Sequence, residues 1–275
     1  MRIDAHIHFW RLARGVNTAL SADMTAIYAD RQPQDLAPLL ARTGIDAIVC
    51  VQASETLGEN LFMLGLAERH DWIAGVVGWL DPGSPALDEE LAALTTIPRF
   101  KGIRPVRNDN RSVRWMLDES LADGWCLIEN TDLTVDLLVQ DWRELPIVTQ
   151  LAQRYRKTTF ILDHCGKPDI AGGQSDEWMA SIDTLANLPN VVCKLSGLLN
   201  CAAPGADASV IRPWSDHVLE RFGSHRVMWA SDWPPLDLVA HYARWSAVSD
   251  DLLAALEPAQ RERILGATAA SFYRL

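Results

Sequence analysis

Short apolar runs alternate along this chain with longer segments in which apolar residues recur every three or four positions. The first pattern is typical of buried strands and the second of amphipathic helices. The predicted strands are Ile3–Phe9, Asp46–Gln52, Ile73–Leu80, Phe100–Pro105, Leu133–Val139, Phe160–His164, Val191–Leu195 and Val227–Ala230. The clearest predicted helices are Leu57–Arg69, Trp142–Tyr155, Trp178–Leu188, Ile211–Phe222 and a closing helix, Ala259–Tyr273.

The predicted strands are apolar almost throughout, which indicates burial on both faces, as in a parallel sheet. Eight strand–helix units in 275 residues favour an α/β fold, a (β/α)8 TIM barrel in which residues 1–275 form a single domain. An open doubly wound sheet is the alternative. No change in composition marks a linker, and the most loop-like stretch is Asn200–Ala208, after the seventh strand.

Polar residues cluster where the predicted strands end. They are His6 and His8, Gln52, Asp81, Arg104, Asp163 and His164, Lys194 and Ser196, and Ser231, Asp232 and Trp233. Residues two apart in a strand share a face, so His6 and His8 are expected to point the same way. Since barrel enzymes gather their catalytic groups at the C-terminal strand ends, the pattern predicts one site at the barrel mouth.

Composition and charge narrow the classes of partner. The formal net charge is -11, without a block of consecutive basic residues, so neither nucleic acid nor an anionic membrane is expected to bind. No apolar stretch approaches the roughly 18 residues of a membrane span, and Asp4, His6 and His8 interrupt the first apolar run, unlike a secretory signal. The expected partner is a small molecule, and a homo-oligomer remains open.

The five cysteines are widely spaced and form no CxxC pair. A disulfide framework or a thiolate zinc site is therefore not expected, and a reducing cytoplasm fits best. The eleven tryptophans are mostly expected in the core, while a few can line a pocket, because an indole face suits the C–H face of a sugar ring.

If the barrel prediction holds, His6, His8, His164 and Asp232 converge on one mouth. Three imidazole nitrogens and one carboxylate make a mononuclear zinc set. The same residues make a metal-free hydrolytic site, in which the carboxylate activates water and the imidazoles stabilise the carbonyl oxygen. The residues alone leave both open.

Six motifs in order resemble a known superfamily: "DAHIHFW", "KGIRP", "LTVDLLV", "FILDHCGKP", "VVCKLSGL" and "MWASDWP". Together they resemble the amidohydrolase-related superfamily, and within it the lactone-hydrolase branch of fuconolactonase-like and dicarboxylate lactone hydrolases. The resemblance covers nearly the whole chain. It implies a (β/α)8 barrel and hydrolysis at a carbonyl, in a branch where a divalent metal is often dispensable.

The resemblance assigns His6 and His8 to the first-strand pair, His164 to the sixth-strand histidine and Asp232 to the eighth-strand base. This chain departs from the binuclear metal pattern at two strands, because the fourth ends in Arg104 and the fifth in Gln140. We therefore expect no two-metal site and no required cofactor. A single non-essential divalent cation such as zinc can bind His6, His8, His164 and Asp232.

The resulting hypothesis is a hydrolase that opens small sugar-acid lactones. Asp232 takes a proton from a water that His164 fixes, His6 and His8 stabilise the oxyanion, and protonated Asp232 returns its proton to the ring oxygen. The predicted substrate contacts are Arg104, Arg107 and Gln52, with a stacking wall from Trp10, Trp79, Trp142 or Trp233. Lys194 is either buried beside the site or a strand-end charge.

The net charge gives no long-range attraction for a dianion, which favours neutral aldonolactones such as fuconolactone. Three alternatives remain: a dicarboxylate lactone hydrolase, a zinc-dependent decarboxylase of the same superfamily, and a barrel that binds a sugar acid without catalysis.

Overall fold

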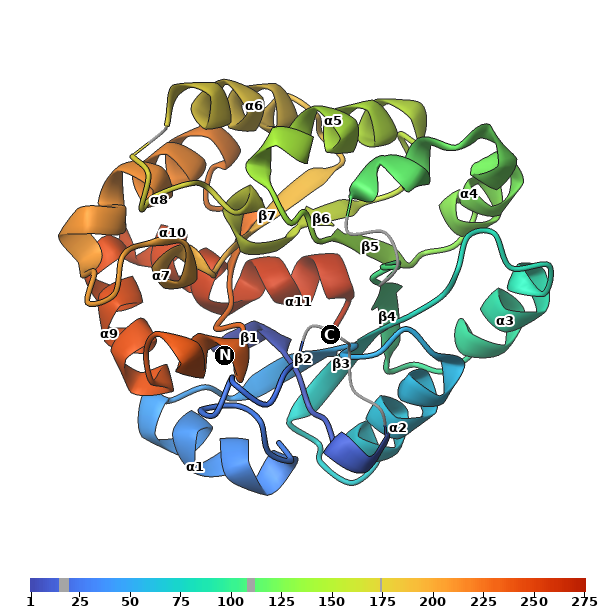
Figure 1. Ribbon diagram of the computed structural model, residues 1–275, viewed down its shortest axis with the longest axis horizontal. Coiled ribbons are helices and arrows are strands. Elements are labelled where there is room, and N and C mark those ends of the chain that lie inside the picture. The colour runs from blue at the N-terminus through green and yellow to red at the C-terminus, as the bar shows by residue number, and fades with distance from the viewer. Residues whose placement is uncertain (15–19, 108–111, 174) are drawn as a thin grey trace.

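Eight parallel strands form one sheet in the computed structural model, which describes residues 1–14, 20–107, 112–173 and 175–275 (Figure 1). The strands are β1 Ile3–Ile7, β2 Ala47–Val51, β3 Ile73–Gly78, β4 Phe100–Ile103, β5 Thr134–Leu137, β6 Phe160–Leu162, β7 Val191–Leu195 and β8 Val227–Trp229. They pair in sequence order from β1 to β8. All eight predicted strands are confirmed, most of them one to three residues shorter at their ends.

The sheet closes on itself between its first and last strands. Ile7 forms a parallel bridge with Trp233, where the His8 amide donates to the Trp233 carbonyl at 2.9 Å and the Asp232 amide donates to the His6 carbonyl at 3.0 Å. The predicted (β/α)8 barrel is therefore confirmed, and the open sheet is wrong.

Helices surround the barrel and cover its outer face, except for α11, which lies across one end of the barrel (Figure 1). They are α1 Pro33–Thr43, α2 Leu57–Ala67, α3 Leu87–Leu94, α4 Ala122–Glu129, α5 Leu145–Arg154, α6 Asp176–Ala186, α7 Leu198–Cys201, α8 Ala208–Phe222, α9 Tyr242–Leu252, α10 Pro258–Glu262 and α11 Thr268–Tyr273. None of the helices in the described residues is long and apolar enough to cross a membrane.

The predicted helices are present with ends shifted by up to three residues, and two other segments differ from the prediction. The closing helix is divided into α10, a π-helical turn at Arg263–Ala267 and α11. The π-helical turn contains Gly266, where a Cβ would lie 2.1 Å from the carbonyl oxygen of Met1. The loop predicted over Asn200–Ala208 begins inside α7, and Ala208 already starts α8, whose cap is Asp207 accepting from the Ser209 and Val210 amides.

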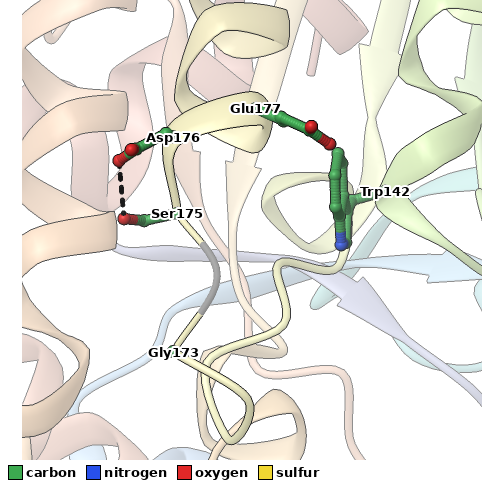
Figure 2. A pocket seen from close by; sticks show the side chains of 5 residues that line it. All are labelled: Trp142, Gly173, Ser175, Asp176 and Glu177. Carbon is green, nitrogen blue, oxygen red and sulfur yellow. Dashed lines mark hydrogen bonds between the residues drawn. The ribbon is translucent and has the colours of Figure 1, made fainter.

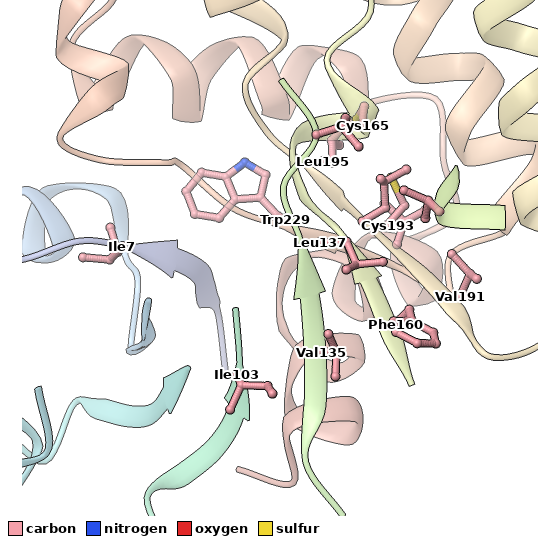
Figure 3. Packing of buried hydrophobic residues seen from close by; sticks show 14 of the residues in the cluster. Ile7, Ile103, Val135, Leu137, Phe160, Cys165, Val191, Cys193, Leu195 and Trp229 are labelled. Carbon is pink, nitrogen blue, oxygen red and sulfur yellow. The ribbon is translucent and has the colours of Figure 1, made fainter. Parts of the chain in front are cut away.

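Alternate strand residues pack into two separate cores. One face packs against the helices, as Figure 3 shows for Val191, Cys193 and Leu195 of β7. The other face fills the barrel interior, where strand residues such as Val192 form one apolar cluster that also includes Ala269 and Tyr273 of α11. Helix α11 covers the end at which the strands begin, since Leu275 lies against Gly75 beside the start of β3. The opposite end is left for a site.

Candidate active site

A bulge in β1 separates the side chains of "DAHIH". Asp4 pairs with Ile48 and Ile7 with Cys50 on β2, so three steps along β1 match two along β2. An extra residue of this kind re-aims the side chains around it. The Asp4 carboxylate accepts the hydroxyl of Tyr242 on α9 at 2.8 Å, whereas the His6 ring reaches residues that follow β6 and β8.

The structure brings the four predicted catalytic residues together. Nε2 of His6 lies 3.1 Å from Nε2 of His8. One carboxylate oxygen of Asp232 lies 3.7 Å from His6 Nε2 and 3.5 Å from His8 Nε2, and the other lies 3.7 Å from His164 Nε2. All four residues are buried, and the Asp232 side chain keeps 12% of its surface exposed.

Left-handed backbone aims two of these side chains inward. His164 has φ 53° and Asp232 has φ 61°, in a region that non-glycine residues adopt rarely. Gly197 permits the His164 geometry: it has φ 69°, and a Cβ there would lie 2.7 Å from the Cβ of His164. The His164 ring is held by Ser196, whose Oγ lies 2.9 Å from Nδ1.

A fully buried charge cluster lies beneath the histidines, and sequence reasoning assigned it no role. Lys194 Nζ pairs with Asp136, lies 3.1 Å from Asp163 Oδ1 and 2.8 Å from Nδ1 of His6. Asp136 also accepts the hydroxyl of Tyr273 at 2.9 Å. The sequence did contain an indication of this cluster, because Asp136 and Lys194 are opposite charges inside largely apolar strands, and buried charges need a partner. Lys194 is thus buried beside the site.

Burial and neighbouring charges set the protonation of the cluster. Burial, together with the Lys194 ammonium, lowers the pKa of His6 well below its usual range, and burial also lowers the pKa of His164. Burial opposes ionisation of Asp232, but the surrounding imidazoles, His164 foremost, hold the pKa of this carboxyl below its ordinary value. At neutral pH the centre therefore combines the neutral rings of His6 and His164 with an ionised Asp232 carboxylate.

Arg104, which the sequence predicts as a substrate contact, lies within this centre. It is 4% exposed; its Nη1 lies 3.4 Å from His6 Nε2 and 3.6 Å from Asp163. Gln52 is completely buried and donates its amide to the Arg104 carbonyl at 3.1 Å. Gln52 therefore contacts the main chain of Arg104, and its role as a substrate contact stays a prediction.

The other predicted substrate contacts have partners of their own. Arg107 pairs with Asp81 at 2.9 Å and stacks 4.2 Å over the ring of Trp115. The indole N–H of Trp10 donates to the Ala29 carbonyl at 2.7 Å, and that of Trp79 donates to Val106 at 2.9 Å.

Two more predicted tryptophans lie in different surroundings. Trp233 is 2% exposed and packs against Phe9, with ring centroids 6.2 Å apart. Trp142 lines a cavity of about 320 Å³ between the loops that follow β5 and β6, with Gly173, Ser175, Asp176 and Glu177 (Figure 2). Its role as a stacking wall stays a prediction.

The central residues fit a divalent metal. His6, His8 and Asp232 each offer one ligand atom within 4.8 Å of the others, as do His6, Asp163 and His164. Tetrahedral zinc with bonds of about 2.0–2.1 Å separates its ligand atoms by about 3.4 Å. The 3.1, 3.5 and 3.7 Å separations in the first group match this value.

Comparison with known proteins identifies the family. The amidohydrolase family model matches residues 3–275, and the chain belongs to that family. It is 38% identical to an L-fucono-1,5-lactonase of Burkholderia ambifaria, over all of this chain and 96% of the relative. It is 34% identical to an L-fucono-1,5-lactonase of Burkholderia multivorans, with 100% and 96% covered.

A crystal structure of an amidohydrolase from Burkholderia multivorans with bound zinc has a TM-score of 0.93 to this chain. The two chains are 34% identical, and the match covers 100% of this chain and 99% of that one. The superfamily suggested by the sequence motifs is confirmed.

Proposed function

We propose that this enzyme hydrolyses small sugar-acid lactones to the free acids, with neutral 1,5-aldonolactones of the L-fuconolactone type as preferred substrates. The observation that carries the proposal is an ionised carboxylate, Asp232, that faces three imidazoles and stays accessible. The two L-fucono-1,5-lactonases that match the entire chain support the substrate class.

The reaction needs one base and at least one oxyanion donor. Asp232 removes a proton from water held by His164, and the hydroxide attacks the lactone carbonyl carbon. The negative oxygen of the tetrahedral intermediate receives hydrogen bonds from His6 and from the Arg104 guanidinium, which lies 3.4 Å from His6. Collapse breaks the bond to the ring oxygen, and protonated Asp232 gives its proton to that oxygen.

His8 contributes differently from His6 in this scheme. Its Nδ1 lies 2.8 Å from the Val51 carbonyl, and a carbonyl only accepts hydrogen bonds. In the neutral ring Nε2 therefore carries the lone pair, so His8 orients the neighbouring groups while His6 and Arg104 supply the donors.

A zinc ion held by His6, His8 and Asp232 would supply Lewis-acid polarisation of the carbonyl. Because a lactone carbonyl is more electrophilic than an amide, imidazole and guanidinium donors suffice without the ion in our proposal. Arg104 and Gln140 stand where a bridging ligand and a fifth-strand histidine would be needed for two metals.

A pH-stat assay with a panel of lactones tests this function. We expect one proton released per turnover, the highest kcat/KM for neutral 1,5-aldonolactones and only weak dependence on ionic strength, since a neutral substrate gains little from steering. A dicarboxylate lactone that outperforms every aldonolactone, with steep inhibition by salt, would contradict the substrate class. No turnover of any lactone would reject the function.

A further inference from the structure

The neutral His6 ring carries one proton, and the groups around Nδ1 and Nε2 determine which nitrogen holds it. Lys194 Nζ lies 2.8 Å from His6 Nδ1, and the same ammonium faces the carboxylates of Asp136 and Asp163. An ammonium has three donors and no lone pair. The Arg104 guanidinium, which also only donates, lies 3.4 Å from His6 Nε2, so a neutral ring can accept from only one of the two groups. The shorter contact makes Nδ1 the acceptor, which places the single proton of the neutral His6 ring on Nε2.

The next contact agrees with that assignment. His8 donates from Nδ1 to the Val51 carbonyl at 2.8 Å, so in the neutral ring Nε2 has a lone pair. This atom lies 3.1 Å from His6 Nε2 and, before substrate binds, accepts a hydrogen bond from the N–H of His6 there. The hydrogen bonds run in one direction, from Lys194 through His6 and His8 to Val51.

A metal at Nε2 of His6 requires the opposite tautomer. An imidazole nitrogen coordinates through its lone pair, and the proton on the other nitrogen then needs an acceptor. Asp163 Oδ1 lies 3.2 Å from His6 Nδ1. Both carboxylate oxygens of Asp163 are buried, and neither makes a hydrogen bond of good geometry among the described residues. Oδ1 faces the Lys194 ammonium at 3.1 Å but can still accept a hydrogen bond from His6 Nδ1, because a carboxylate oxygen has more than one lone pair.

We propose that Lys194 and Asp163 compete for Nδ1 of His6, and that the outcome decides whether His6 serves as a hydrogen-bond donor or as a zinc ligand. Lys194 favours the donor form and weakens zinc binding at His6, His8 and Asp232. Asp163 favours the ligand form. The ring keeps one proton in both states, so His6 changes tautomer without changing charge.

Zinc affinity gives the direct test. Partners that orient a metal ligand typically change affinity by about 10- to 100-fold. We expect Lys194→Met to tighten the zinc Kd by about that factor and Asp163→Asn to weaken it similarly, measured with zinc and a competing chromophoric chelator. A Lys194→Met protein with the wild-type zinc Kd, or with weaker binding, overturns the proposal, as does tighter binding in Asp163→Asn.

Tyr273→Phe is the matched control, because it removes a hydrogen bond from the same buried cluster without touching His6. Its zinc Kd should equal that of the wild type, and tightening equal to that of Lys194→Met overturns the proposal. Since Lys194→Met leaves the Asp136 carboxylate buried without its ion pair, Lys194→Met/Asp136→Asn provides a second variant in which position 136 carries no charge, with the same expected tightening.

Nitrogen-15 NMR of the imidazoles reads the tautomer directly. Without zinc, the His6 Nε2 signal should be that of a protonated nitrogen, and zinc should move the proton to Nδ1. A zinc-free spectrum with Nδ1 protonated overturns the assignment. The oxyanion role of the donor form rests on the proposed function, but Kd and NMR do not, so absent lactone turnover leaves both results interpretable.

Discussion

Gln52 and Arg104 hydrogen-bond to each other's main chain across β3. Arg104 Nη2 donates to the Gln52 carbonyl at 2.6 Å, and the Gln52 amide donates to the Arg104 carbonyl at 3.1 Å. Because each residue follows a different strand, the pair joins the ends of β2 and β4. The guanidinium is thereby held in place before any ligand arrives.

Arg104→Lys should reduce kcat by about 100- to 1,000-fold, the usual effect of losing one oxyanion donor. A lysine keeps the charge but cannot contact Gln52, His6 and Asp163 together as the planar guanidinium does. Steady-state kinetics on the best lactone measure the change. Arg107→Lys is the comparison and should raise KM more than it lowers kcat; equal effects of the two variants would contradict the assignment.

Asp232→Asn should lower kcat by at least about 100-fold, because the amide keeps the shape but cannot accept a proton from water. His164→Asn should have a smaller effect if His164 only orients the water. Near-normal turnover by Asp232→Asn would mean that another group activates the water.

Removal of metal should leave most of the turnover intact. The expectation follows from the donors of His6 and Arg104, which provide oxyanion stabilisation without a cation. Dialysis against a strong chelator, with residual zinc measured by atomic emission, provides the check. Complete loss of activity that zinc alone restores would favour a metal-dependent reaction.

Asp4→Asn should reduce the pH dependence of stability. Burial raises the pKa of Asp4 from 3.8 to about 6 in the folded protein, so the folded state binds this proton more tightly than the unfolded state. Wild-type stability should therefore gain from Asp4 as the pH falls from about 7 to about 4. The variant loses this gain. Urea unfolding across that pH range measures how the free energy of unfolding depends on pH, and the same dependence in Asp4→Asn and wild type would refute the role of Asp4.

In Asp4→Asn, the pH dependence of the free energy of unfolding should become weaker but not disappear, because burial also raises the pKa of Asp136 to about 6. Tyr242→Phe serves as the control, since it removes one partner of Asp4 but leaves the titrating carboxyl buried.

Gly197→Ala should reduce both stability and kcat. The new Cβ would lie 2.7 Å from the Cβ of His164, so the histidine must shift; overpacking of this kind costs about 1–3 kcal/mol. Gly44→Ala is a matched control, because Gly44 has nearly the same φ, 67°, with nothing within 4 Å of the added carbon. Gly197→Ala should have a lower melting temperature and a lower kcat than Gly44→Ala. Equal kcat values in the two variants would show that catalysis tolerates a shift of His164.

The strands and the histidine pair were predictable because their signals are local. Burial on both faces requires apolar runs, and polar residues at their ends mark the mouth of the barrel. Short, charge-rich helices such as α3 escaped prediction, since packing on the sheet stabilises them more than their own sequence does. The pairing of Asp136 with Lys194 was also not predicted, because the two residues lie on different strands, β5 and β7, that are far apart in the sequence.

The left-handed backbone of His164 and Asp232 could not be read from the sequence at all. Neither residue is a glycine, and such backbone persists where the surrounding structure over-determines it. The β1 bulge is equally invisible, because the strict two-residue alternation predicts Asp4 on the same face as His6.

The seam that closes the barrel also carries the candidate site. Asp4 accepts the Ser231 amide at 2.9 Å across 227 positions of sequence, and His6 and Asp232 meet beside that bond. Contacts so distant along the chain form slowly during folding, because the loop between them must first be closed. Activity recovered during refolding should therefore report closure of the barrel, arriving with the last pairing of strands and never before it.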